Sequence, residues 1–99
     1  MSNDIITRKI MANPKSYVIF YSDWCAYSLN AIQLLKDKQV QYKGYNIDKI
    51  NGKMNTVLHY LEITKDITKF KSSHTSRPII FKYSQFLGGY TELKRDFEK

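Results

Sequence analysis

The single cysteine of this 99-residue chain, Cys25, follows a short apolar run and precedes a segment with helical spacing. A thiol at the first turn of a helix meets unpaired backbone N–H groups and the positive end of the helix dipole. Both favour the thiolate, and cysteines so placed have pKa values lowered from ~8.5 to roughly 3.5–7.5. The alternative is an inert, small apolar residue, which is what most lone cysteines are. A reactive sulfur is therefore predicted if other groups converge on this position.

Several residues could complete a site around this sulfur. Trp24 and Tyr27 offer flat apolar walls, although both could equally be ordinary core aromatics. The glycines at residues 88–89 allow a ligand to approach the backbone closely. The N–H groups of Tyr90 and Thr91, at the start of an expected helix, can bind a carboxylate. The alternative for residues 88–91 is a tight hairpin exit followed by an ordinary helix cap.

A proline further along the chain could also belong to the site. The residue before Pro78 must be extended, and proline itself offers no N–H. A cis Arg77–Pro78 bond would turn the Arg77 backbone outward, where it could pair with an extended peptide ligand. Only ~5–6% of such bonds are cis, so the sequence leaves this open. His59 and His74 have no metal-ligand spacing with Cys25 or with each other, and we interpret both as structural or surface residues.

Strands and helices alternate along the first half of the chain, and a hairpin follows in the second half. This order predicts parallel pairing of the first two strands and antiparallel pairing in the late hairpin. The expected class is α/β, a small mixed sheet of four strands with helices on both faces. The expected elements are a helix capped by residues 2–4 and ended by residues 13–14, strands at 16–21 and 41–47, helices at 26–38 and around 54–61, a turn at 48–51, a short helix plus a loop at 62–75, strands at 79–83 and 86–87 joined by a turn at 84–85, and a final helix at 90–97.

Length and composition favour one domain over residues 1–99, without an internal disulfide. No run of eighteen apolar residues and no signal-peptide pattern is present, which predicts a soluble, cytoplasmic protein and no membrane partner. The formal net charge of +7 is spread along the chain. It could serve solubility, attract a small anion or bind nucleic acid. Only three of the 16 basic residues are arginines, which argues against sequence-specific DNA binding.

Three stretches of the chain, in order, resemble the glutaredoxins, a branch of the thioredoxin-like fold. Residues 24–28 (W-C-A-Y-S) resemble the family's C-P-Y-C or C-x-x-S site. Residues 76–81 (S-R-P-I-I-F) resemble T-V-P-x-I-F with its cis-proline, and residues 86–93 (F-L-G-G-Y-T-E-L) resemble I-G-G-x-x-D-L. The resemblance covers residues 16–97. It implies a thioredoxin-like (glutaredoxin) sheet and a cis Arg77–Pro78 bond.

The resemblance also implies a function and a set of site residues. The function is a monothiol, glutathione-dependent thiol-disulfide oxidoreductase that reduces glutathionyl mixed disulfides of proteins or small molecules, as a monomer. The implied catalytic residues are Cys25 as nucleophile and Ser28, which could donate a hydrogen bond to the thiolate. The residues implied to bind glutathione are Tyr27, Arg77, Pro78, Gly89, Tyr90 and Thr91.

The sequence departs from the family pattern at several of these positions. Serine at position 28 removes the resolving thiol, so reduction of protein disulfides should be poor. Ser22 stands where many glutaredoxins carry a lysine, Thr75 stands where a basic residue is usual, and Asp23 adds a negative charge near the thiol. Arg77 stands where the family usually has valine and could supply the missing positive charge. We therefore expect weaker glutathione binding than in a lysine-containing relative.

Two other functions remain compatible with the resemblance. Some C-x-x-S glutaredoxins carry a [2Fe–2S] cluster between two protomers, ligated by one cysteine of each and by two glutathiones; Cys25 would then be the metal ligand. Those proteins typically have C-G-F-S, which residues 26–27 do not match. The other alternative is a binding module that keeps the fold with weak catalysis. The lysines of residues 62–76 could contact an acidic partner or serve only solvation.

Overall fold

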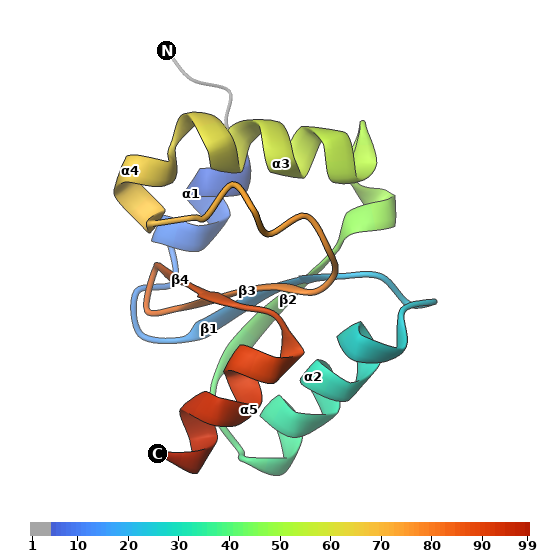
Figure 1. The fold of residues 1–99 in the computed structure, drawn as a ribbon, viewed down its shortest axis with the longest axis vertical. Helices are drawn as coiled ribbons and strands as arrows, with labels where there is room; N and C mark the ends of the chain where they lie inside the picture. Colours follow the sequence, from blue (N-terminus) through green and yellow to red (C-terminus); the bar gives the residue numbers. More distant parts are fainter. Residues whose placement is uncertain (1–4) are drawn as a thin grey trace.

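The computed structural model describes residues 5–99, so the cap expected at residues 2–4 lies outside the described residues. The order of elements matches the expected alternation of strands and helices (Figure 1). They are α1 (Ile5–Met11), β1 (Tyr17–Tyr21), α2 (Ala26–Asp37), β2 (Tyr42–Asn46), the 3₁₀ helix η1 (Ile47–Lys49), α3 (Lys53–Ile63), α4 (Lys65–Thr68), β3 (Ile79–Lys82), β4 (Gln85–Gly88) and α5 (Tyr90–Glu98).

The four strands form one mixed sheet in the order β2-β1-β3-β4. β1 pairs with β2 in parallel, whereas β1 with β3 and β3 with β4 are antiparallel. Helices cover both faces, with α1, α3 and α4 on one side and α2 and α5 on the other (Figure 1). The expected α/β class and the thioredoxin-like arrangement are therefore confirmed.

Alternation along β1 divides the core into two layers, because successive side chains of a strand point to opposite faces. Val18 and Phe20 pack in the cluster beneath α1 and α3, and Ile19 packs in the cluster beneath α2 and α5. All three are fully buried. Strand β1 thus lies between two apolar layers, and its carboxyl end delivers the chain to the loop that carries Cys25.

The hairpin turn and the link after β2 differ from the sequence expectation. The turn lies at Tyr83 and Ser84 rather than at residues 84–85, and both residues have positive φ, of 53° and 70°. This is the conformation of a two-residue type I′ hairpin, whose twist matches that of the strands. The Ser84 hydroxyl, buried, donates to the Ile10 carbonyl oxygen at 3.2 Å and ties this turn to α1. The turn expected after β2 is the 3₁₀ helix η1.

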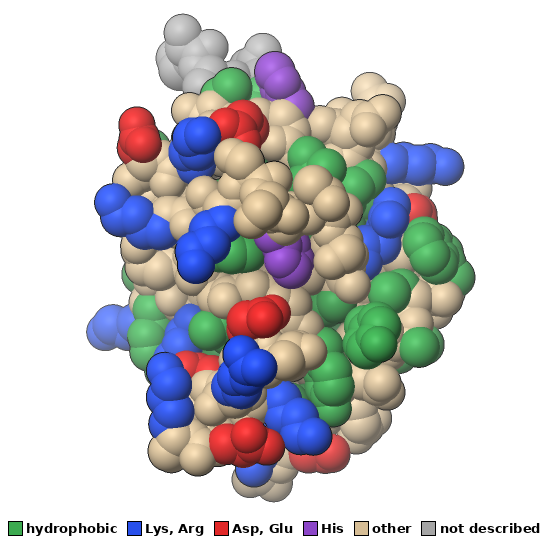
Figure 2. Space-filling model, viewed as in Figure 1, with side chains coloured by type: hydrophobic (Ala, Val, Ile, Leu, Met, Phe, Trp, Pro, Cys, Tyr) green, Lys and Arg blue, Asp and Glu red, His purple; other side chains and the backbone are tan. Residues whose placement is uncertain are grey.

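The surface carries the positive charge in dispersed form. Lysine and arginine side chains are scattered over the face seen in Figure 2, between acidic and uncharged ones. Hydrophobic side chains gather on the right of that view, over the loop before α2 and the beginning of this helix. The exposed large residues of that segment are Trp24, Tyr27 and Leu29. Among residues 5–99, no helix has the length and apolar character needed to cross a membrane.

Candidate active site at Cys25

Cys25 is the N-cap residue of α2, in extended conformation, and is half-buried. Its N–H donates to the Ser22 carbonyl oxygen at 3.2 Å, which closes the loop between β1 and the helix. Ser28 lies one turn into α2 and is fully buried. Its hydroxyl oxygen accepts a hydrogen bond from the Ser22 N–H at 3.2 Å. Both ends of the loop are therefore held, and the sulfur lies at the first turn of the helix as the sequence predicts.

The surroundings of Cys25 favour its thiolate. Burial alone would raise the pKa of the Cys25 thiol. Hydrogen bonds from the Ser28 N–H, the Ser28 hydroxyl and the Tyr27 N–H, together with the positive charge of Arg77, outweigh burial and lower the pKa below its ordinary value. The N–H donors belong to the first turn of α2, where backbone groups have no partner within the helix. This part of the site therefore favours the nucleophilic thiolate form of Cys25.

The Arg77–Pro78 peptide bond is cis. The Cys25 thiol donates to the Arg77 carbonyl oxygen, with 3.8 Å between sulfur and oxygen. The Arg77 guanidinium stacks on the Trp24 indole, with 4.9 Å between Cζ and the ring centroid. The Arg77 Nε is buried and has no hydrogen-bond partner among the described residues. The segment 77–78 thus borders the sulfur through the Arg77 carbonyl oxygen.

A pocket of about 160 Å³ lies beside this segment and is formed by three separate stretches of the chain. Five of the residues predicted to bind a ligand line it together: Tyr27, Arg77, Gly89, Tyr90 and Thr91. The rings of Tyr27 and Tyr90 face each other at 6.4 Å between centroids. Pro78 is buried and does not line the pocket. Five of the six residues predicted to bind the ligand therefore converge on this pocket, and Pro78 does not line it.

The first turn of α5 lies in the wall of this pocket. The Gly89 N–H donates to the Glu92 carboxylate at 2.7 Å in a capping box. This hydrogen bond lowers the pKa of Glu92, and burial opposes the shift. The Gly89 N–H is therefore already occupied within the protein, and a ligand at Gly89 would contact the backbone without this donor. The next two N–H groups, of Tyr90 and Thr91, are those that helix geometry leaves without an intrahelical acceptor, and they could bind an anion.

Sequence reasoning missed three residues that line the same pocket: His74, Ser76 and Glu92. His74 was interpreted as structural or surface because it lacks metal-ligand spacing, but its ring packs against the site. Its Nε2 donates to the Pro78 carbonyl oxygen at 3.0 Å. A Cβ added to Gly89 would lie 3.2 Å from its Cε1. Glu92 could have been found, since a Glu three residues after Gly89 is a capping-box signal.

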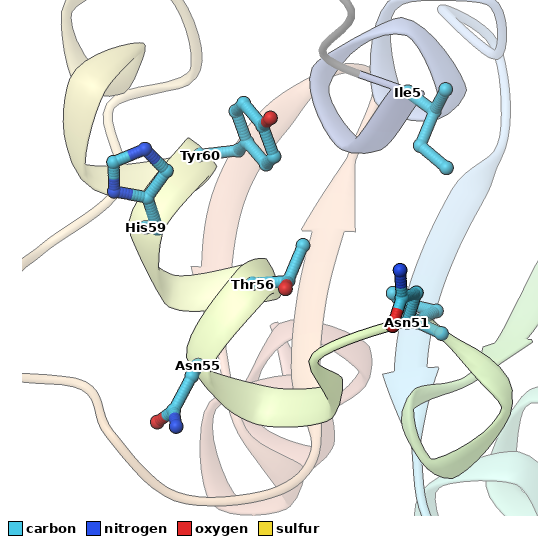
Figure 3. Close-up of a pocket in the computed structure, with 7 residues that line it drawn as sticks. Ile5, Asn51, Asn55, Thr56, His59 and Tyr60 are labelled. Carbon is cyan, nitrogen blue, oxygen red and sulfur yellow. The ribbon is translucent and has the colours of Figure 1, made fainter.

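A larger hollow lies in the opposite layer, between α1 and α3 (Figure 3). Its volume is about 420 Å³, and its described lining comes from α1, the loop directly after η1, and α3. None of the described residues that line it is a cysteine, lysine or arginine. Volume alone therefore does not indicate the reactive site, whereas convergence of donors on a sulfur does. Among residues 5–99, no group of three or more His, Cys, Asp or Glu side chains could hold a metal ion.

Comparison with known proteins agrees with the fold. The glutaredoxin family model matches residues 17–70. A protein of Acanthamoeba polyphaga mimivirus described as a probable glutaredoxin is 37% identical over 91 residues, covering 91% of this chain and 86% of the relative. The crystal structure of the holo form of glutaredoxin C1 from Populus tremula x tremuloides aligns with a TM-score of 0.69 at 20% identity, covering 96% of this chain and 88% of that one.

A second similar structure is that of a buckwheat glutaredoxin–glutathione complex, with a TM-score of 0.68 at 13% identity, covering 98% of this chain and 86% of that one. At these identities the two structures support the fold alone. The fold and the cysteine at the first turn of α2 define a protein of the thioredoxin-like, thiol-redox class. The family match and the viral relative go further, and this chain belongs to the glutaredoxin family. Its role is accordingly that of a thiol-disulfide oxidoreductase.

Proposed function

We propose that this protein reduces glutathionyl mixed disulfides through the single thiol of Cys25, with glutathione as co-substrate. The observation that carries the proposal is the juxtaposition of sulfur and pocket. The Cys25 sulfur lies 3.8 Å from the carbonyl oxygen of Arg77, and Arg77 also lines the pocket in which Tyr27, Tyr90 and Thr91 meet. A ligand seated in that pocket would have its sulfur next to the nucleophile.

The groups around the pocket fit a short peptide thiol with two carboxylates. The N–H groups at the first turn of α5 suit one carboxylate. The Arg77 guanidinium suits the other, because Arg77 lines the pocket, forms no ion pair among the described residues, and arginine pairs with carboxylates through two parallel hydrogen bonds. The Arg77 backbone next to the cis-proline suits the peptide of the ligand. Glutathione has this set of groups, and the buckwheat relative in the comparisons is described as its complex.

The proposed reaction is a pair of thiol–disulfide exchanges. The Cys25 thiolate attacks the glutathionyl sulfur of a mixed disulfide, the old S–S bond breaks, and the substrate leaves as a thiolate that takes up a proton. Free glutathione, as its thiolate, then attacks the glutathionyl sulfur on Cys25. This step releases glutathione disulfide and regenerates the Cys25 thiolate. The substrate gains two electrons, and two glutathione units become the oxidised disulfide.

Within this scheme the chain's own groups have distinct tasks. The Ser28 hydroxyl and the first-turn N–H groups stabilise the thiolate both as nucleophile and as leaving group. The chain contains one cysteine, so no second thiol competes with glutathione for the mixed disulfide on Cys25. The proposal is therefore monothiol, and Ser28 acts on the pKa rather than as a resolving residue.

The decisive experiment follows reduction of a small glutathionyl mixed disulfide by excess glutathione. We expect turnover with the parent protein, none above background with Cys25→Ser, and retained turnover with the control Asn55→Ala, whose side chain lines the hollow in the other layer. Mass spectrometry should also detect one glutathionyl group on Cys25 after exposure to substrate alone. A folded parent that accepts no glutathionyl group would overturn the proposal. So would a parent that shows the visible absorbance of a [2Fe–2S] cluster and has no turnover of the mixed disulfide.

A further inference from the structure

A chain of three contacts connects η1, on the far side of the active-site loop, with the reactive sulfur. The Asp48 carboxylate accepts a hydrogen bond from the Trp24 indole N–H at 2.8 Å. The Trp24 ring carries the Arg77 guanidinium at 4.9 Å. The Arg77 carbonyl oxygen lies 3.8 Å from the Cys25 sulfur. Three segments that are distant in sequence therefore meet around one indole ring.

The Trp24 indole supports the Arg77 guanidinium, which has no acidic partner among the described residues. Among the described residues, Arg77 forms no ion pair, and its Nε is buried without a partner. Trp24 itself is 67% exposed, so packing does little to fix its ring. A free indole in such a position would sample several rotamers. The hydrogen bond from its N–H to Asp48 selects one of them.

Asp48 is itself well anchored for this task. Its N–H donates to the side-chain oxygen of Asn46 at 2.9 Å, in the N-cap of η1. The side-chain nitrogen of Asn46 donates in turn to Asp23, in the active-site loop, at 3.0 Å. The neighbouring Ile47 is fully buried in the core. Asp48 therefore stands in the 3₁₀ helix η1, whose N-cap hydrogen bonds and buried Ile47 fix the position of its backbone.

We propose that Asp48 is a positioning residue for anion binding at the active site. It fixes the Trp24 indole, and the fixed ring holds the Arg77 guanidinium at the rim of the pocket, ready for a carboxylate of the ligand. A negative carboxylate on the indole N–H also makes the ring face a better partner for a cation. The inference rests on the proposed function in one respect, that the anion is a carboxylate of glutathione.

Positioning and simple charge predict opposite results when Asp48 is removed. If Asp48 were only a nearby negative charge, Asp48→Ala would strengthen anion binding, because a repulsive charge is gone. If it positions Trp24 and Arg77, the same variant should weaken binding of oxidised glutathione by roughly fivefold, as expected for a lost cation–π and hydrogen-bond arrangement. The binding is measured by calorimetry in a Cys25→Ser background, which separates it from any thiol chemistry.

A matched control and a second variant make the outcome unambiguous. Asp23→Asn removes an equal charge from the active-site loop and keeps an acceptor for Asn46, so it should leave affinity unchanged or slightly raised. In Trp24→Phe, which keeps a ring but has no N–H, adding Asp48→Ala should change affinity by less than twofold. Since Trp24 is the only tryptophan, its fluorescence and its quenching by acrylamide report directly how firmly the Trp24 ring is held. Asp48→Ala should increase quenching, and Asp23→Asn should not.

Three results would overturn the inference: tighter binding by Asp48→Ala, equal effects of Asp48→Ala and Asp23→Asn, or an undiminished effect of Asp48→Ala in the Trp24→Phe background. Each of these results would contradict the positioning role of Asp48 even if the parent protein reduces mixed disulfides normally, so the proposed function would stand. Conversely, a parent without turnover that still binds oxidised glutathione, and loses affinity in Asp48→Ala, would contradict the proposed function and leave the positioning role standing.

Discussion

Two cations of this chain, Lys82 and Arg77, rest on aromatic rings in similar ways but differ in their anions. The Lys82 ammonium lies 5.4 Å from the ring centre of Tyr83 and 2.8 Å from the Asp96 carboxylate. The Arg77 guanidinium lies 4.9 Å from the Trp24 ring centre, and no described acid pairs with it. One cluster contains its own counter-charge, whereas the other leaves a place for a charge from outside.

The electrostatics of the closed cluster show that its members satisfy one another. The hydrogen bond to Asp96 raises the pKa of Lys82, with burial opposing. Burial would raise the pKa of Asp96, but hydrogen bonds from Lys82 and Tyr17 outweigh it and lower the pKa. The cluster joins β1, β3 and α5 at the end of the sheet where β1 begins, whereas Cys25 follows the other end of β1. We infer that a cation with an internal partner serves stability, and one without serves binding.

The sharpest test of this contrast is Arg77→Met, which keeps the length of the side chain and removes its charge. We expect the KM for a glutathionyl mixed disulfide to rise by roughly tenfold to a hundredfold, because a charge-assisted hydrogen bond is worth about 1.5–3 kcal/mol. The free energy of unfolding should stay within about 0.5 kcal/mol of the parent, since no internal ion pair is lost. Steady-state kinetics and urea unfolding measure the two quantities. A destabilised variant with unchanged KM would reverse the assignment.

The sequence predicts most of the fold because its signals are local and agree with one another. The β-branched and aromatic run of β1, the apolar spacing in α2 and the hairpin pattern around Pro78 each specify one element. The sequence predicted the hairpin turn one residue too late, because Tyr83 and Ser84 are not the Asn-Gly or Asp-Gly pair that marks a type I′ turn. The positive φ of both residues is imposed by the strands on either side.

The site was predicted only where its residues lie in motifs. Cys25, Arg77 and Thr91 stand in stretches whose spacing points to a thiol and an anion. His74 and Asp48 contact residues that are distant from them in sequence: the His74 ring packs against Phe86 at 5.3 Å between ring centroids, and Asp48 accepts a hydrogen bond from the Trp24 indole. Neither contact has a local signal, since each depends on how the sheet and η1 bring loops together. Such residues become visible only in three dimensions.

The second prediction concerns the closed cluster. Asp96→Asn keeps a hydrogen-bond acceptor but removes the charge that Lys82 requires. Because the Asp96 side chain is only 8% exposed and its hydrogen bond to Lys82 is charge-assisted, we expect the free energy of unfolding to fall by about 1.5–3 kcal/mol. Turnover should be unchanged, since the cluster is remote from Cys25. Lost activity in a variant of unchanged stability would show that the two clusters are coupled.

The third prediction gives the pH dependence of that loss. The pKa of Asp96 is lower in the folded protein than in the unfolded chain, so its contribution is fully present above the unfolded value of ~3.9 and disappears as pH falls through the folded value. The stability difference between the parent and Asp96→Asn should therefore be constant from about pH 7 to pH 5 and then shrink toward zero in stronger acid. Urea unfolding at a series of pH values measures it. A difference that persists at pH 2 would mean that shape, not charge, carries the effect.

The smallest expected effect belongs to Tyr17, whose hydroxyl donates to Asp96 at 3.0 Å. Tyr17→Phe keeps the ring between Tyr83 and Phe97 and removes one hydrogen bond, so we expect a loss of about 1 kcal/mol at neutral pH. Burial, together with the hydrogen bond to Asp96, raises the pKa of Tyr17 to about 12. A raised pKa stabilises the fold below the unfolded value of ~10, and this contribution is lost as pH rises toward the folded value.

The difference between the parent and Tyr17→Phe should therefore narrow between pH ~10 and about 12, while both proteins also lose the Lys82–Asp96 pair as the ammonium deprotonates. Ultraviolet titration of the phenol, with Tyr17→Phe as the subtraction control, follows the same proton directly. A parent in which no tyrosine has a raised pKa, or in which the stability difference grows with pH, would mean that Tyr17 is not hydrogen-bonded to Asp96 in solution. The closed cluster would then reduce to the single ion pair, and its contrast with Arg77 would rest on Lys82 alone.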